Sequence, residues 1–149
     1  MTSNDLRRQS HARRQARRVA MQALYQWQLT GYHPKDILLQ YREDPELEKA
    51  DLEYFRELLL GVTDQVDDLD ELLTPLMDRS VAELDPVERA ILRLATYELK
   101  SRIEIPYRVV INEAVELTKK FGATDGHKYV NGVLDKLGRQ LRAVEAGQV

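Results

Sequence analysis

Apolar residues recur along most of this chain with the spacing of an α-helix. In the first segment they fall at i, i+3, i+4, i+7, i+8 and i+11, which predicts a long amphipathic helix that ends near Gly31. This apolar stripe consists of Ala16, Val19, Ala20, Ala23, Leu24 and Trp27. Arg13 and Arg14 are expected near the first turn of the helix, just before the stripe begins.

The same helical period continues after Gly31. Pro34 is suited to start a short second helix, and the chain is expected to break before Pro45. A long apolar run over residues 52–76 predicts a further helix, which Gly61 or Pro75 bends or ends.

The second half of the chain contains clear helix boundaries. Residues 85–88, D-P-V-E, combine a capping Asp, a Pro at the first helical position and a Glu three residues after the Asp, as in a capping box. Two more helices are expected, one from Pro106 to a stop at Gly122 and one opening around Thr124. Because alternating apolar and polar positions are essentially missing, the predicted fold class is all-α, a single-domain bundle of about six or seven helices.

Composition removes several classes of chemistry. The chain has no cysteine, which excludes disulfides, thiolate catalysis and cysteine zinc sites. Its three histidines lack metalloprotease spacing and no nucleophile-elbow serine is present, so we expect neither an enzyme, nor a metal, nor a cofactor. No apolar run approaches the roughly 20 residues of a membrane span, which favours a cytoplasmic location.

Charge is distributed unevenly. Residues 1–30 carry six Arg and one Asp, a net charge of +5, whereas residues 31–149 carry sixteen basic and twenty-four acidic side chains, a net charge of −8. The overall charge of −3 therefore conceals a cationic segment that is suited to phosphates.

Two interpretations of the arginine segment stand side by side: a solvated terminus without a role, and a phosphate-binding surface. Arg13, Arg14, Arg17 and Arg18 fall at i, i+1, i+4 and i+5, on one flank of the apolar stripe. Cations near a first helical turn oppose the helix dipole by about 0.3–1 kcal/mol each, which favours an anionic ligand there. The planar guanidinium also suits phosphate.

Residues 121–129, F-G-A-T-D-G-H-K-Y, form a second candidate for nucleic-acid binding. The glycines would let backbone N–H groups approach an anion at a helix N-terminus, Lys128 adds charge, and Tyr129 offers a ring on which a base stacks for about 1–3 kcal/mol. The alternative is a helical corner in which Phe121 and Tyr129 belong to the core. A helix-turn-helix that reads duplex DNA is disfavoured by Asp125 and Asp135, so single-stranded RNA fits better.

Two further aromatic residues differ in their expected roles. Trp27 continues the apolar stripe and is expected in the core, whereas Tyr25 lies off its centre and is a candidate for a protein interface. Glu88 has a sufficient structural role as the return partner of the capping box, and an interface role for it would be additional.

Four segments carry a resemblance to a known family: R-R-Q-A-R-R-V-A-M-Q-A-L-Y-Q-W-Q (13–28), Y-F-R-E-L-L-L-G-V (54–62), V-E-R-A-I-L-R-L-A-T-Y-E-L (87–99) and I-P-Y-R-V-V-I-N-E-A-V-E-L-T-K-K-F-G-A-T-D-G-H-K-Y-V-N-G-V-L-D-K-L (105–137). They resemble the bacterial transcription antitermination factor family NusB. The resemblance suggests three segments: a basic, flexible extension over 1–12, a helical RNA-binding domain over 13–142, and a tail over 143–149.

What the resemblance implies is a non-enzymatic factor that pairs with NusE, which is also a small-subunit ribosomal protein. Together they would bind single-stranded boxA RNA of ribosomal RNA leaders and help the antitermination complex of RNA polymerase to read through terminators. The implied RNA-binding residues are Arg13, Arg14, Arg17, Gly122, Asp125, Lys128, Tyr129 and Asn131. The implied partner-binding residues are Tyr25 and Glu88, and the free protein is either a monomer or a homodimer that hides this surface.

Two other interpretations stay open. NusB-like domains also occur fused to RNA cytosine methyltransferases, but the absence of cysteine removes the nucleophile that this chemistry needs. A helical scaffold that binds only protein, through its acidic middle, is the other alternative and differs in having no affinity for RNA.

Overall fold

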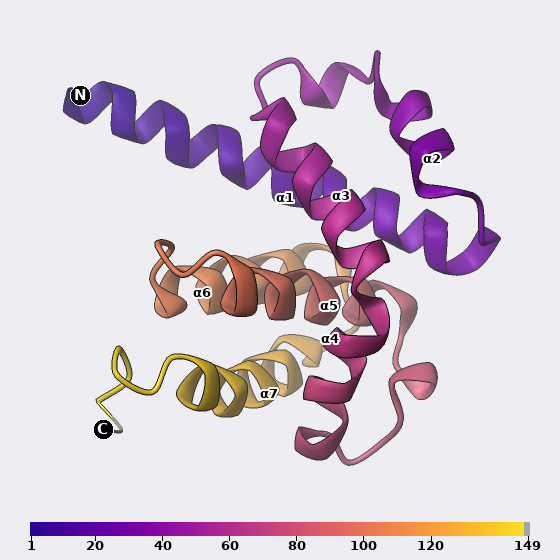
Figure 1. Ribbon diagram of the computed structural model, residues 1–149, viewed down its shortest axis with the longest axis vertical. Helices are drawn as coiled ribbons and strands as arrows, with labels where there is room; N and C mark the ends of the chain where they lie inside the picture. The colour runs from indigo at the N-terminus through magenta and orange to yellow at the C-terminus, as the bar shows by residue number, and fades with distance from the viewer. Residues whose placement is uncertain (148–149) are drawn as a thin grey trace. The chain divides into compact units, whose positions relative to one another are not determined.

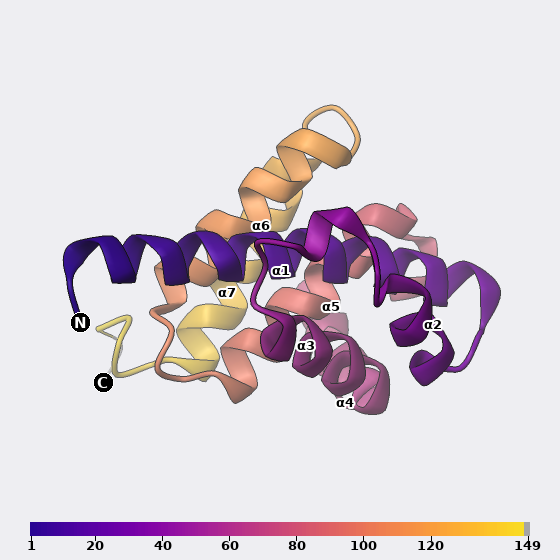
Figure 2. The same ribbon diagram turned by 90° about the horizontal axis from the view of Figure 1, so that it is seen from above.

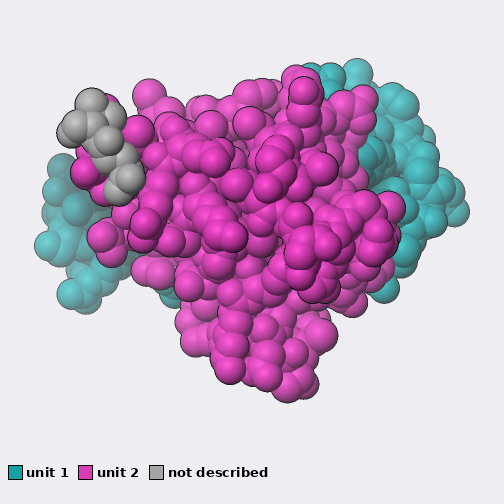
Figure 3. Space-filling view, turned by 90° about the horizontal axis from the view of Figure 1, so that it is seen from below, with its two compact units in different colours: residues 1–64 teal, residues 65–149 magenta. Residues whose placement is uncertain are grey.

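The computed structural model describes residues 1–147, which form seven α-helices, three short 3-10 helices and no strand (Figure 1). This confirms the predicted all-α class and the long N-terminal helix. The helices group into two compact units, residues 1–64 and 65–149 (Figure 3). No composition shift in the sequence predicts a boundary at this point. Gln148 and Val149, the end of the expected tail, lie outside the described residues.

The first unit is built on α1 (Ser3–Thr30), a helix of 28 residues that Figure 2 shows running without interruption. The Thr2 side chain accepts from the amide of Asp5 and the Asp5 carboxylate returns to Thr2, which caps the helix start. At the other end, Gly31 has φ 70°, the left-handed conformation that ends helices. The predicted apolar stripe is buried except at Trp27, which is only partly buried.

The start of α1 corrects one expectation. Because the helix begins at Ser3, Arg13 and Arg14 lie about three turns inside it and not in its first turn. The helix dipole acts mainly within the first and last turns, so the predicted dipole penalty on these two arginines is absent.

The rest of the first unit packs against α1. The predicted short helix is α2 (Pro34–Tyr41), followed by a 3-10 turn η1 (Pro45–Leu47) and by α3 (Leu52–Asp64). The buried side chains of α3 face α1, while Tyr41 of α2 stacks at an angle on Phe55, with ring centroids 5.9 Å apart. This packing closes the core of the unit.

The long run predicted over 52–76 is not one helix. α3 ends at Asp64, and α4 (Val66–Leu73) starts after Gln65, whose φ of −104° and ψ of 16° are not helical. The break therefore falls at Gln65, while Gly61 lies inside α3 and Pro75 lies in the 3-10 turn η2 (Thr74–Leu76) that follows α4. The apolar period continues through the break, which is why the pattern did not reveal it.

The second unit is centred on α5 (Pro86–Ser101), which packs against both α6 (Tyr107–Phe121) and α7 (Gly126–Leu141). The turn η3 (Val81–Glu83) precedes α5. The Asp85 side chain caps α5 by accepting from the amides of Val87 and Glu88, as predicted. Arg93 of α5 donates to both carboxylate oxygens of Asp70 at 2.9 and 2.8 Å, which joins α5 to α4.

Arg142 links the end of α5 to the turn before α6. Its buried guanidinium donates to four backbone carbonyls at the end of α5 and in the turn that leads to α6. The acceptors are the carbonyl oxygens of Glu98, Leu99, Arg102 and Ile105. Glu145 accepts a further bond from it at 2.8 Å, so the charge is compensated. Two carbonyls of the last turn of α5, those of Glu98 and Leu99, thereby gain a donor without a glycine cap.

Candidate nucleic-acid interface

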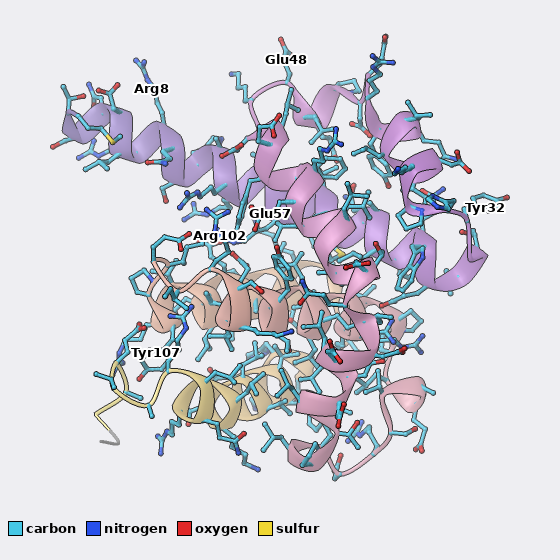
Figure 4. All side chains as sticks on the ribbon, in the orientation of Figure 1. Arg8, Tyr32, Glu48, Glu57, Arg102 and Tyr107 are labelled. Atoms are coloured by element: carbon cyan, nitrogen blue, oxygen red, sulfur yellow. The ribbon has the colours of Figure 1, made fainter. Side chains whose placement is uncertain are left out.

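The arginines of α1 do not form a single solvent-facing flank. Arg7, Arg8 and Arg14 are exposed, and Figure 4 shows the Arg8 side chain extending outward from the first half of the helix. Arg13 is half-buried and Arg17 is only 4% exposed. The exposed arginines are therefore concentrated in the half of α1 that precedes the apolar stripe.

Two of the other arginines contact Tyr54 of α3. The guanidinium carbons of Arg13 and Arg17 lie 5.4 and 5.6 Å from the centroid of its buried ring, within the range of a cation–π contact. Arg18 donates to the Glu46 carboxylate at 3.3 Å. Arg17 thus helps to hold α1 against α3, and its predicted role in RNA binding remains a prediction that its burial does not favour.

The turn between α6 and α7 is tight because two glycines are packed against neighbouring side chains. A Cβ on Gly122 would lie 2.8 Å from both the methyl and the carbonyl oxygen of Thr118. A Cβ on Gly126, which is buried, would collide with the Glu88 carboxylate. Asp125 reverses the chain between them with φ 63°, a left-handed conformation that is uncommon outside glycine.

This geometry changes the predicted use of the glycines. The amide of Gly122 donates to the Thr118 carbonyl, that of Gly126 to the Ala123 carbonyl and that of Lys128 to the Asp125 carbonyl, at 2.8, 3.0 and 3.1 Å. Both glycines serve internal packing, and three amides of the turn already have internal acceptors. An anion site made of these backbone N–H groups is therefore not what the turn provides, and its side chains carry the candidate chemistry.

Glu88 lies under this turn. Its side chain is 8% exposed and its carboxylate lies against Gly126 instead of returning to the amide of Asp85, so its predicted role in a capping box is wrong. Burial raises the pKa of Glu88, the Asp85 carboxylate raises this pKa further, and Arg79 lowers it. Glu88 supports the start of α7, and a direct role in partner binding remains a prediction.

Tyr129, on the first turn of α7, is held in place by two residues of the loop before η3. The Arg79 guanidinium carbon lies 4.5 Å from the Tyr129 ring centroid, and the Tyr129 hydroxyl donates to Asp78 at 3.2 Å. Arg79 also donates to Asp78, at 2.9 Å, which lowers the pKa of that carboxyl. Partial burial and the nearby Asp78 raise the pKa of Tyr129, so the phenol stays protonated. Sequence reasoning did not find Asp78 or Arg79, because no local pattern marks them.

The other predicted residues of this unit do not gather in one place. Lys128 is exposed and pairs with Asp125 at 3.5 Å. Lys128 and Tyr129 line a groove of about 440 Å³ between α7 and residues 75–78. Asn131 lines a different groove, of about 250 Å³, between α6 and α7, together with Arg108, Asn112 and Arg139. Gly122 and Asp125 shape the turn and line neither groove.

Tyr25, the predicted partner-binding residue of α1, is 38% exposed. Leu29 lies one turn further along the same helix and Tyr32 follows the helix end, and both are more than half exposed. Figure 4 labels Tyr32 beyond the end of α1. Exposed apolar side chains in such a group are typical of a protein interface, where tyrosine is enriched.

The described part of the chain offers neither a metal site nor a membrane-spanning helix. Within residues 1–147, His, Asp and Glu side chains form no group of three or more that could hold a metal ion. None of the helices over the same residues has the length and apolar character needed to cross a membrane.

The fold and these surfaces define an all-helical protein that displays cationic and aromatic side chains on α1 and α7. Its sequence matches the NusB family over residues 14–139. The chain belongs to this family.

Individual relatives agree with this assignment. The transcription antitermination protein NusB of Alcanivorax borkumensis is 60% identical over 137 residues, which cover 92% of this chain and 91% of the relative. The protein of the same name from Pseudomonas savastanoi pv. phaseolicola is 54% identical over 136 residues, or 91% of this chain and 82% of the relative.

Solved structures support the fold. T. maritima NusB matches with a TM-score of 0.75 and 32% identity, over 85% of this chain and 91% of that one. A chain in the crystal structure of the antitermination factors NusB and NusE in complex with dsRNA matches with a TM-score of 0.75 and 29% identity, over 85% of this chain and 96% of that one.

Proposed function

We propose that this protein is a non-enzymatic, RNA-binding transcription antitermination factor. With NusE it binds single-stranded boxA RNA of ribosomal RNA leaders in the cytoplasm, and as part of the antitermination complex it promotes read-through by RNA polymerase. Family membership carries the proposal, because the relatives with 60% and 54% identity are both named as antitermination proteins.

The surface chemistry supports RNA as a ligand. Arg7, Arg8 and Arg14 are exposed on α1 and supply guanidinium groups that suit phosphate oxygens. Lys128 and Tyr129 of α7 supply a further positive charge and an aromatic ring, the pairing that single-stranded nucleic-acid sites use. A related complex contains NusB, NusE and RNA together, which supports both partners for this chain.

Protein partner binding is proposed for the exposed apolar group of Tyr25, Leu29 and Tyr32 on the first unit. Glu88 is assigned a supporting role, since its carboxylate lies against Gly126 beneath the turn. A homodimer of the free protein would bury this apolar group in the interface between its two copies. Light scattering of the protein with and without NusE tests this, and a concentration-independent monomer would contradict it.

A salt titration tests the RNA proposal. Fluorescence anisotropy of a labelled single-stranded boxA-like RNA should give a log–log slope of about −3 to −4 for roughly four to six phosphate contacts. A scaffold that binds only protein would show no RNA affinity, which would refute the proposal.

A duplex RNA of the same sequence tests the preference for a single strand, because the RNA complex of a relative contains a duplex. Equal affinity for the duplex would overturn the single-strand preference.

A further inference from the structure

The groove of about 250 Å³ between α6 and α7 is lined by two asparagines, one from each helix. Asn112 lies inside α6 and Asn131 inside α7, so neither of them caps a helix end. Asparagine is a poor helix former at such positions, because its side chain competes for backbone hydrogen bonds. Both side chains are exposed, and within residues 1–147 neither carboxamide has a hydrogen-bond partner. Helix stability and internal packing therefore do not account for these two asparagines.

Two arginines add positive charge to the same groove. Arg108 precedes Asn112 by one turn of α6, and Arg139 comes from the last turn of α7. Arg139 already pairs with Asp135, another residue of the groove, at 3.2 Å. The guanidinium carbon of Arg108 lies 5.5 Å from the ring centroid of Tyr107, and Arg108 forms no ion pair within the described residues. The Arg108 guanidinium can therefore receive a carboxylate from a ligand.

This groove is poorly suited to a nucleotide or an organic cofactor. Its aromatic residue, Tyr107, is 8% exposed, so the groove offers no open ring on which a base could stack. The Asp135 carboxylate would repel a phosphate. The volume of about 250 Å³ also lies below the roughly 300–1,000 Å³ of most small-molecule sites. A short segment of a larger chain fits these dimensions better.

An extended peptide supplies the groups that the groove lacks. Each carboxamide offers both a donor and an acceptor, which match the C=O and the N–H of a peptide backbone. The planar guanidinium of Arg108 forms paired, charge-assisted hydrogen bonds with a carboxylate. Two arginines and one aspartate leave the groove with a net charge of +1, which favours an acidic segment over a basic one.

We infer that this groove binds an extended acidic segment of a protein partner, with Asn112 and Asn131 bonded to its backbone and Arg108 to one of its carboxylates. The site is distinct from the groove that Lys128 and Tyr129 line. It goes beyond the proposed RNA-binding function and does not depend on it. Asn131 is thereby assigned to protein binding instead of RNA binding.

Nuclear magnetic resonance of the isotope-labelled full-length protein tests the inference with defined probes. The probe is a short synthetic peptide of alternating Glu and Thr, and the same peptide with Gln or with Lys in place of Glu is the matched control. The side-chain amide signals of Asn112 and Asn131 should shift with the Glu peptide, less with the Gln peptide, and not with the Lys peptide. Unchanged signals at millimolar Glu peptide would overturn the inference.

Variants measure the two kinds of contact. Asn112→Ala combined with Asn131→Ala should weaken binding of the Glu peptide roughly tenfold, as expected for two lost hydrogen bonds. The melting temperature should stay the same or rise, because alanine favours helix. A clearly lower melting temperature would show that the asparagines serve the fold, which would contradict the inference.

The charge contact and its control are measured in the same way. Arg108→Met should abolish the preference for the Glu peptide over the Gln peptide, and an unchanged preference would contradict the assigned role of Arg108. Gln140→Ala removes an exposed carboxamide of α7 outside the groove and should bind the Glu peptide like the wild type.

RNA titration of the double asparagine variant separates this site from the proposed function. The variant should bind boxA-like RNA as tightly as the wild type. Weaker RNA binding by the variant would make the groove part of the RNA surface and would overturn the inference. Absence of RNA binding by the wild-type protein would refute the proposed function, whereas the peptide titration would still decide the inference.

Discussion

The arginine segment of α1 and the outer face of α7 were both predicted to bind RNA, yet they use their charges differently. On α1, Arg17 is buried, Arg13 and Arg17 lie against the Tyr54 ring, and Arg18 pairs with Glu46. On α7, Lys128 is exposed, and Tyr129 lines an open groove. A cluster of positive charge in a sequence therefore includes both side chains that pack inside the protein and side chains that face a ligand. Only the folded structure distinguishes the two kinds.

The largest expected effect is on stability, at the structural end of α1. Arg17→Ala should lower the free energy of unfolding by about 2–3 kcal/mol, because it removes a desolvated cation–π contact and the packing of the side-chain stem. Arg14→Ala, at an exposed position of the same helix, should change it by no more than about 0.5 kcal/mol. Urea unfolding of both variants measures the difference. Equal stabilities would show that Arg17 does not support the first unit.

Tyr129→Ala should have the next largest effect, on RNA affinity. Loss of one stacked base costs about 1–2 kcal/mol, or roughly five- to thirty-fold in Kd. The melting temperature should change little, because Tyr129 is held by contacts with Asp78 and Arg79 at the surface of the unit. RNA titration and thermal unfolding of the same sample test both statements. A collapsed melting temperature would identify Tyr129 as a core residue.

Arg14→Ala should affect RNA binding more modestly. An exposed arginine that contacts one phosphate contributes about 0.7 to the magnitude of the log–log salt slope on a single strand. The affinity should fall by the same factor for boxA-like and unrelated RNA, because phosphate contacts carry no sequence information. Titrations over a range of salt concentrations, with both RNAs, provide the measurement. A loss confined to one sequence would argue against a phosphate contact.

The smallest effect concerns Glu88, the buried charge of the second unit. Its pKa is raised above the usual 4.5 when folded, so its contribution to stability is greatest below about pH 4.5 and is lost as the pH rises through the raised pKa. Glu88→Gln cannot ionise and should lack this part of the pH dependence. The difference in melting temperature between wild type and variant, followed from pH 4 to 8, tests the sign. A difference that stays constant over this range would contradict the account.

The helical period predicted most of this fold because it depends on local spacing. The start of α5 was found from Asp85 and Pro86, and the end of α1 from Gly31, since caps are local too. The break at Gln65 was missed because the apolar period continues across it. The start of α1 at Ser3 was also missed, although Thr2 and Asp5 carry the capping signal.

The candidate site was less accessible to sequence reasoning because its decisive contacts join distant residues. Tyr129 and Asp78 are 51 positions apart, and nothing near Tyr129 indicates that Arg79 lies over its ring. The partner of Arg17 lies on another helix, so the count of arginines could not show which of them are buried. Gly122 and Gly126 were singled out for an anion site, whereas the structure requires glycine there because of close contact with Thr118 and Glu88.

The central claim is that the exposed arginines of α1 and the outer face of α7 each contact RNA. RNA affinity of the wild type, Arg14→Ala, Tyr129→Ala and the double variant, measured at one salt concentration, tests it most directly. We predict that each single variant binds more weakly and that the double variant shows the sum of the two losses in free energy, as expected for contacts that act independently. A single variant that binds as tightly as the wild type would contradict the claim, because the substituted surface would then make no contact with RNA.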